Sequence, residues 1–412
     1  MSTFTCPIVT VKTVTLNMNS DNLDILTFEE IGWVCQDVRG KRKVGDKVIY
    51  IPIDSLVDCS RLEFEFLMKN AKMRKVRPLP ESEEVLRPLA RIKTIKLRGE
   101  ISQGLVIDLP NEFWIQIGQD DLGKIDELYG QYIIDRRDDD AIKVRGFAPV
   151  GTDASPMVGV TKYEPPQEAV FSANAKGNFP SWCPKTDAER YQNVNRTIEP
   201  YLNDLFSVSI KIDGTSMTVF YDRLREGDEF GVCSRNQELK PPEQDPSASV
   251  ATKYGFAMDS YWKAATEQNL REKIYAIAVN NGYQRVALQF ELAGEGIQKN
   301  TAGIKGQLPW LFDIYVTKEG FEGYLDYIQM IHMAEEYDIL TVPIVWKTIP
   351  LSELIGNPPD FSFLQALKYP SGHPIEGLVF VSAHEKFVGK LGRLKFKYVN
   401  QQYLLKTEKD DE

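Results

Sequence analysis

The chain has 412 residues, 42% of them hydrophobic and 26% charged, which is the composition of a globular protein with room for two domains. Its formal net charge of −10 argues against a protein that merely coats nucleic acid, and its five scattered cysteines lack the C-x-x-C spacing of a zinc site. No apolar run approaches the ~18 residues of a membrane span and the first residues lack a secretory pattern, so we expect an intracellular protein without membrane contact.

Residues 1–150 are predicted to form a β-rich domain. Glycine turns bound short apolar runs, and the candidate strands are Ile8–Leu16, Asp24–Cys35, Lys47–Ile53, Arg91–Lys96 and Gly104–Leu109. Several short strands with basic loops are typical of a small closed barrel, most economically an OB fold. The basic run Lys41, Arg42 and Lys43 is a candidate RNA contact, although such runs are more often solvated loops and the barrel could instead dock a protein.

Residues 151–185 are expected to form a linker, because prolines and glycines recur there and disfavour regular structure. Its aromatic residues suggest that it packs onto the domain that follows. The segment Lys185–Asn193 has the pattern of a helix start, with Thr186 as the cap and Glu189 three residues later. Arg190 in this segment either faces a phosphate of the nucleic acid or is an exposed helix arginine, and the two interpretations have equal weight.

Residues 186–412 are predicted to form an α+β domain of antiparallel sheets flanked by helices. Helical patterns cover Asp259–Asn281 and Gly323–Tyr337, and strand patterns fill much of the rest. The segment has no βαβ alternation and no G-x-G-x-x-G, which argues against a Rossmann sheet.

Lys211 is the most informative residue of the chain. It ends an apolar strand-like run, Asp213 and Gly214 follow it, and the chain then resumes a strand at Thr215. A lysine amine is a nucleophile at neutral pH only if its pKa is depressed, which burial or a nearby cation can achieve. A K-x-D-G sequence alone is weak, because a solvated hairpin lysine is the more common meaning of one match.

Five further short sequences follow Lys211 in order. They are Ser234-Arg235-Asn236, the strand Val286–Leu292 with Glu291, the strand Trp310–Val316 with Phe312, Glu376 before the strand Gly377–Val381, and Arg393–Tyr398 with Lys395 and Lys397. In the last segment charged and apolar residues alternate, so Lys395 and Lys397 are expected on one face of a strand.

This ordered set resembles motifs I, Ia, III, IIIa, IV and V of the covalent nucleotidyltransferases, a superfamily of DNA ligases, RNA ligases and mRNA capping enzymes. Thr215-Ser216 after the K-x-D-G and the K-x-K form of the last motif are similar to RNA ligases. Only about fifteen residues follow Lys397, too few for the second OB domain of capping enzymes and DNA ligases. The predicted barrel at the other end is similar to the RNA-ligase branch with an amino-terminal OB domain.

The resemblance implies an ATP-dependent RNA ligase that joins 3′-hydroxyl and 5′-phosphate ends, in RNA repair, through a lysyl-AMP on Lys211. Lys395 and Lys397 would clamp the α-phosphate, and the nucleotide contacts would also include Ile210, Arg235, Glu291, Phe312 and Val379. Asp213, Glu291 and Glu376 are expected to hold hydrated Mg²⁺ or Mn²⁺, because three acids without histidine suit a hard cation that keeps waters. A ribose contact by Glu291 competes with this metal role, and both stay open.

Two other functions fit the same residues. One is a catalytically silent RNA-binding protein on this scaffold, and the other is a DNA nick ligase with the same chemistry. We favour the RNA ligase, acting as a monomer with RNA and ATP as partners, because all six sequences are intact.

Overall fold

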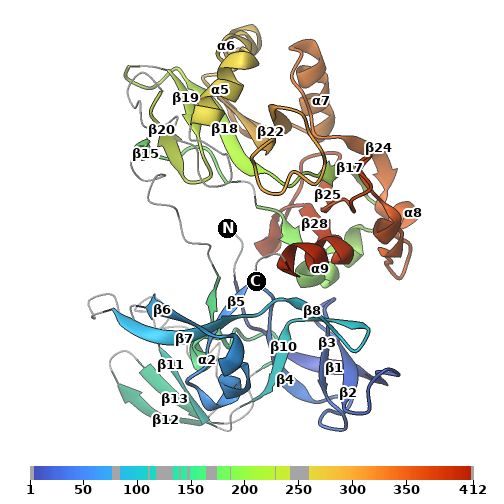
Figure 1. Ribbon diagram of the computed structural model, residues 1–412. Helices are drawn as coiled ribbons and strands as arrows, with labels where there is room; N and C mark the ends of the chain where they lie inside the picture. The colour runs from blue at the N-terminus through green and yellow to red at the C-terminus, as the bar shows by residue number, and fades with distance from the viewer. Residues whose placement is uncertain are drawn as a thin grey trace. The chain divides into compact units, whose positions relative to one another are not determined.

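The computed structural model describes residues 4–76, 84–109, 112–116, 133–138, 141–145, 149–163, 174–185, 187–227, 229–241 and 259–409. The chain divides into two compact units, Thr3–Pro165 and Pro166–Lys406, each with its own core (Figure 1). None of the described helices is both long and apolar enough to cross a membrane.

The first unit is built from short antiparallel strands. These are β1 (Ile8–Leu16), β2 (Leu23–Phe28), β3 (Val34–Val38), β4 (Lys47–Ile51), β5 (Ser55–Asp58), β6 (Lys72–Val76), β7 (Val85–Arg91), β8 (Thr94–Leu97), β9 (Glu100–Gln103), β10 (Leu105–Asp108), β11 (Glu112–Gln116), β12 (Ile133–Asp138), β13 (Ala141–Arg145) and β14 (Thr161–Lys162). The largest sheet has the order β10-β4-β1-β2-β3, and a second sheet has the order β14-β5-β7-β6. Ile8, Ile49 and Ile51 are fully buried in the core of this unit, together with Phe64 from the 3₁₀ helix Leu62–Asn70.

Two strands occupy the segment Asp24–Cys35, where the sequence predicted one. β2 and β3 pair as a hairpin with Leu26 opposite Cys35. Glu30, in the turn between them, accepts a hydrogen bond from the Thr10 backbone N–H at 2.7 Å. A side chain of the turn thus satisfies a backbone donor of β1. The prediction was wrong because the apolar residues of this turn are buried in the core like strand residues.

The second unit contains two sheets. Their strands are β15 (Ala175–Asn178), β16 (Glu189–Arg190), β17 (Leu205–Lys211), β18 (Thr215–Asp222), β19 (Phe230–Cys233), β20 (Gln237–Leu239), β21 (Arg285–Gly294), β22 (Gln307–Lys318), β23 (Phe321–Tyr324), β24 (Ile344–Pro350), β25 (Gly377–Ser382) and β28 (Lys395–Val399), beside the small hairpin β26 (Phe387–Val388) and β27 (Gly392–Arg393). One sheet has the order β15-β20-β19-β18-β21-β22-β23 and the other β16-β28-β25-β17-β24. All neighbours are antiparallel except β16 and β28.

Helices pack on both sheets. They are α4 (Tyr191–Ile198), α5 (Asp259–Glu267), α6 (Leu270–Asn281), α7 (Tyr327–Glu336), α8 (Leu351–Ile355) and α9 (Gln401–Lys409). Side chains of α5, α6 and α7 share a core with the seven-stranded sheet, whereas α4 and α8 share one with the five-stranded sheet (Figure 1). Antiparallel sheets flanked by helices are the predicted α+β arrangement, which is confirmed.

Three predicted helix boundaries differ from the structure. The predicted helix Asp259–Asn281 is divided into α5 and α6, because Asn269 takes a left-handed conformation with φ of 51°. The helix predicted from Gly323 starts only at Tyr327, where Asp326 and Gln329 form a capping box after β23. In the segment Lys185–Asn193 the chain first forms β16, and Thr186 lies outside the described residues.

Candidate active site

The Lys211 side chain lies where the chain passes from one sheet to the other. Lys211 is the last residue of β17 in the five-stranded sheet, and Thr215 is the first residue of β18 in the seven-stranded sheet. The turn between them is tight against β21: a Cβ on Gly214 would lie 2.4 Å from the Leu292 carbonyl oxygen. Glycine is therefore required at this position, and the turn presents Lys211 beside the gap between the sheets.

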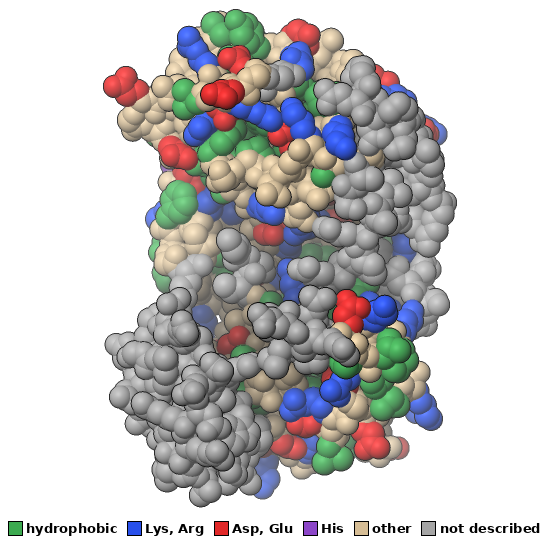
Figure 2. All heavy atoms as spheres, turned by 90° about the vertical axis from the view of Figure 1, so that its left-hand side faces the viewer, with side chains coloured by type: hydrophobic (Ala, Val, Ile, Leu, Met, Phe, Trp, Pro, Cys, Tyr) green, Lys and Arg blue, Asp and Glu red, His purple; other side chains and the backbone are tan. Residues whose placement is uncertain are grey.

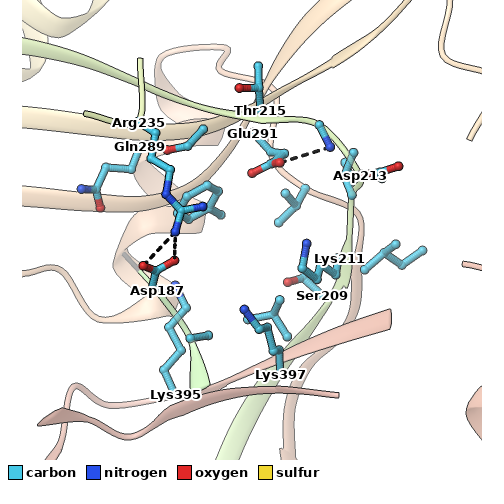
Figure 3. A pocket seen from close by; sticks show the side chains of 18 of the residues that line it. Asp187, Ser209, Lys211, Asp213, Thr215, Arg235, Gln289, Glu291, Lys395 and Lys397 are labelled. Carbon is cyan, nitrogen blue, oxygen red and sulfur yellow. Dashed lines mark hydrogen bonds and ion pairs between the residues drawn. The ribbon is translucent and has the colours of Figure 1, made fainter. Parts of the chain in front are cut away.

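A cavity of about 350 Å³ opens at this point, and residues of both sheets line it (Figure 3). Most residues proposed from the sequence are among its lining: Ile210, Lys211, Asp213, Arg235, Glu291, Phe312, Val379, Lys395 and Lys397. They come from strands far apart in the sequence, so the predicted grouping of the motifs is present in space.

Lys211 lies among three carboxylates. Its side chain is 24% exposed, and its Nζ lies 2.6 Å from Glu376 Oε1. Burial acts to lower the pKa of Lys211, but the carboxylates of Glu376, Glu291 and Asp213 together outweigh it and raise the pKa above its ordinary value. These protein groups alone therefore keep the amine protonated.

The three acids around Lys211 have separate partners. Glu291 accepts the Gly214 backbone N–H at 3.1 Å, and burial raises the pKa of Glu291 to about 7. Asp213 accepts a hydrogen bond from the Tyr403 hydroxyl. Glu376 is 9% exposed, and burial raises its pKa; its Oε2 is buried without a hydrogen-bond partner among the described residues.

These acids fit a hydrated cation better than a directly ligated one. In the described part of the chain, no three Asp, Glu, His or Cys side chains are placed to bind one metal ion directly. All three acids nevertheless act electrostatically on Lys211, and the unpartnered Glu376 oxygen is a buried acceptor that a metal-bound water can satisfy. The metal role of Asp213, Glu291 and Glu376 stays a prediction.

The two lysines of β28 differ in their environment. Lys395 is 8% exposed and its Nζ lies 2.5 Å from Asp313 Oδ2, while Arg393 contacts the other oxygen of Asp313 at 3.0 Å. For Lys397, burial and then the charges of Lys211 and Arg190 lower the pKa to about 8, although the carboxylates of Asp187 and Glu376 act to raise it. Both lysines line the cavity, so the predicted strand face is shared.

Aromatic and arginine side chains complete the wall. Phe312 is half-buried, and the Lys395 ammonium lies 5.1 Å from its ring centroid. Arg235 is 60% exposed and binds both oxygens of Asp187, at 2.9 and 3.0 Å (Figure 3). Arg190 of β16 pairs with Lys397 of β28. Arg190 therefore lies near the cavity, but it is not one of the residues that line it.

Sequence reasoning missed four residues of this site. Gln289 and Ser209 are buried polar residues of the cavity wall, each two positions from a predicted residue on the same strand, and strand alternation could have found them. Asp187 lies close to Arg190, but its pairing with Arg235 has no local sequence pattern. Tyr403 lies after the last motif, and no sequence pattern indicated its contact with Asp213.

The basic run of the first unit has a different setting. Arg42 is buried and is held by Asp37 at 2.6 Å and by Asp108, so its guanidinium serves an internal ion-pair network. The Asp108 carboxylate also lies 3.6 Å from Lys41. Lys41 and Lys43 are exposed, and for these two the RNA role stays a prediction.

Comparisons with known proteins agree with this architecture. The RNA ligase family model matches residues 204–399, and the PHA02142 OB-fold domain model matches residues 6–109. No curated protein sequence matches the chain.

Solved structures of an RNA ligase from Naegleria gruberi match over nearly the whole length. A mutant without ligand is 26% identical with a TM-score of 0.68, and 98% of each chain is covered. A mutant with ATP and Mn is 27% identical with a TM-score of 0.68, covering 97% of this chain and 98% of the other. A complex with pyrophosphate is 26% identical with a TM-score of 0.67, covering 98% of each.

The predicted OB fold and ligase domain are thus confirmed in the predicted order, and Lys211 with most of the residues that line its cavity lies inside the region that the family model matches. The chain carries a ligase domain that matches the RNA ligase family model, behind an amino-terminal OB-fold domain, and these matches support an RNA ligase enzyme.

Proposed function

We propose that this chain seals RNA 3′-hydroxyl and 5′-phosphate ends with ATP, through AMP bound covalently to Lys211. The observation that carries the proposal is the position of Lys211 in a cavity that also contains Lys395, Lys397 and Phe312. This set provides a nucleophile, cations for phosphate and an aromatic face for a base. The Naegleria relative has been solved with ATP and Mn, which supports ATP and a divalent cation for this chain as well.

The reaction consists of three phosphoryl transfers. In the first, the lone pair of the Lys211 amine attacks the α-phosphorus of ATP, a P–N bond forms, the bond to the β-phosphate oxygen breaks, and pyrophosphate leaves. In the second, the 5′-phosphate oxygen of RNA attacks the same phosphorus, and the lysine is released. In the third, the RNA 3′-hydroxyl attacks the activated 5′-phosphorus, and AMP leaves. Each transfer requires in-line geometry and neutralised phosphate charge.

The first transfer depends on the proton of Lys211. An ordinary lysine with a pKa of about 10.4 has about 1 free amine in 2,500 at pH 7, equivalent to ~4.6 kcal/mol. Glu376 and its neighbours increase this cost, since by themselves they raise the pKa of Lys211. A divalent cation bound by these acids would offset their charge, favour the free amine and neutralise charge on the phosphates.

The other residues of the cavity bind and orient the nucleotide. Lys395 and Lys397 line the cavity, and in this proposal they bind the α-phosphate and stabilise the charge that develops on it. Phe312 stacks on adenine beside Ile210 and Val379. Arg235 offers two N–H groups to a phosphate or ribose once it leaves Asp187. Glu291 contacts either the ribose or metal-bound water.

RNA contacts are proposed for cations outside the cavity lining. Lys41 and Lys43 are exposed in the first unit, and the partly buried Arg190 lies beside Lys397 in the second. In the view of Figure 2, Lys and Arg side chains are interspersed with Asp and Glu. Within an acidic total charge, individual cations of each unit can still bind RNA phosphates. We propose that one chain acts as a monomer.

The test is covalent labelling of the chain by α-labelled ATP with Mn²⁺ or Mg²⁺. Wild type should acquire label that resists denaturation, and Lys211→Ala should acquire none. Lys318→Ala, a lysine change at the end of β22 and outside the lining of the Lys211 cavity, should label normally. No label on wild type with either metal would refute the proposal, and sealing of an all-DNA nick in preference to an RNA 3′-hydroxyl would change the substrate to DNA.

A further inference from the structure

The helix α9 reaches back to the turn that carries the nucleophile. Tyr403, in the first turn of α9, donates its hydroxyl hydrogen to Asp213 Oδ2, the acid two residues after Lys211. The two residues are 190 positions apart, and Tyr403 lies beyond residue 399, where the match to the family model ends. The family motifs therefore do not include this contact.

The start of α9 is fixed by a fully buried residue. The Asn400 backbone N–H donates to the Glu376 carbonyl oxygen at 2.8 Å, and its side-chain amide donates to the Leu364 carbonyl oxygen at 3.1 Å. Asn400 Oδ1 then accepts the Gln402 backbone N–H at 2.9 Å, as a cap residue does. The helix is thus tied to the segment that carries Glu376, the acid paired with Lys211.

Tyr403 holds Asp213 from the protein side. The Tyr403 residue is 7% exposed, so water has little access to replace its hydroxyl, whereas Asp213 is only half-buried and lines the cavity. Nearby, the Tyr369 hydroxyl donates to the Lys211 backbone carbonyl oxygen at 3.3 Å. The backbone of the nucleophile and the side chain of the following acid are each held by a tyrosine hydroxyl.

We propose that Tyr403 is a positioning residue that orients the Asp213 carboxylate for the divalent cation of the adenylylation step. A hydrogen bond to one carboxylate oxygen restricts rotation of the group and would leave the second oxygen for a metal-bound water. Partners of metal-binding side chains commonly change metal affinity by about 10- to 100-fold when they are removed. This inference rests on the proposed function for the identity of the step, but the affinity of the protein for the cation can be measured without the reaction.

The experiment compares Tyr403→Phe with wild type in the full chain. Tyr315→Phe is the matched control, because Tyr315 donates to Glu322 at 2.9 Å in the same unit and does not line the cavity. Two quantities are measured: the Mn²⁺ concentration that gives half-maximal labelling by α-labelled ATP, and Mn²⁺ binding without ATP from the electron paramagnetic resonance of the free ion. Tyr403→Phe should raise the half-maximal Mn²⁺ concentration about tenfold with an unchanged plateau, and the control should not.

A second pair of variants tests whether Tyr403 acts through Asp213. In an Asp213→Ala background, Tyr403→Phe should add no further loss of Mn²⁺ affinity. Equal Mn²⁺ dependence of Tyr403→Phe and wild type would overturn the proposal, and so would a thermal midpoint lowered far beyond that of Tyr315→Phe, which marks a purely structural role. If wild type is not labelled, the proposed function fails, and the Mn²⁺ affinities alone decide on Tyr403.

Discussion

Asp313→Asn is the most informative single substitution outside the nucleophile. Asp313 is 2% exposed and lies between Lys395 at 2.5 Å and Arg393 at 3.0 Å. Removing one partner of a buried ion pair costs about 3–5 kcal/mol, because the remaining charge is buried without compensation. Arg393 keeps its ion pair with Glu385 at 2.7 Å, so Lys395 is the cation left without its carboxylate. We therefore expect a loss of stability near the lower limit of this range, about 3 kcal/mol.

The assay combines thermal unfolding, urea unfolding and ATP labelling. For a domain of this size 1 kcal/mol lowers the thermal midpoint by about 2–4 °C, so Asp313→Asn should lower it by roughly 6–12 °C. Labelling at a temperature where the variant is folded should also fall, since Lys395 loses the contact that holds it beside Phe312.

Lys395→Met in the Asp313→Asn background supplies the control. Removing both charges should recover part of the stability, since apolar replacement of a buried pair is often neutral, but it should not recover labelling. An Asp313→Asn variant within about 0.5 kcal/mol of wild type would refute the reasoning, because such a value is typical of exposed pairs.

Three further predictions follow from the same contacts. Burial acts to raise the pKa of Asp313, but Arg393 and Lys395 hold it below its ordinary value. Wild type should therefore be more stable than Asp313→Asn by the full amount above about pH 4, and this difference should disappear as the pH falls through the folded-state pKa of Asp313. Urea unfolding of both proteins across this pH range measures the difference. Gly214→Ala should lose labelling and about 1–3 kcal/mol of stability, whereas Gly177→Ala, with open space at its Cβ, should keep both. Arg235→Lys should leave the thermal midpoint unchanged because Arg235 is 60% exposed, and should raise the KM for ATP roughly tenfold.

The sequence predicted best those elements in which apolar and polar residues alternate with the period of a strand. The strand Ile8–Leu16 was predicted with its observed bounds, and the alternation of Lys395 with apolar neighbours correctly placed both β28 lysines on the cavity face. Boundaries failed where tertiary contacts override local pattern. The left-handed conformation of one residue, Asn269, breaks the predicted helix Asp259–Asn281. The helical spacing of apolar residues continues across this position, so it gives no sign of the break.

The grouping of the site was predictable, but the contacts that hold it were not. The order of the motifs predicted that Lys211, Glu291 and Lys395 would meet, because a known family uses that order. The partners of these residues are long-range: Asp313 lies 82 positions from Lys395 and Tyr403 lies 190 from Asp213. Such distances leave no periodic pattern in one sequence.

Close backbone approach limits which residues can surround Lys211 at the crossing between the two sheets. Strand β25 pairs with β17 on one side and β28 on the other, and a Cβ on Gly377 of β25 would lie 2.2 Å from the Tyr398 carbonyl oxygen of β28. Gly214 faces the same constraint against β21. Both glycines act through backbone approach rather than chemistry. Gly214 lets the turn after Lys211 lie against β21, and Gly377 lets β25 lie against β28, so Lys211, Asp213, Glu291 and the β28 lysines line one cavity. The geometry of the site therefore depends on close backbone packing both between and within the two sheets.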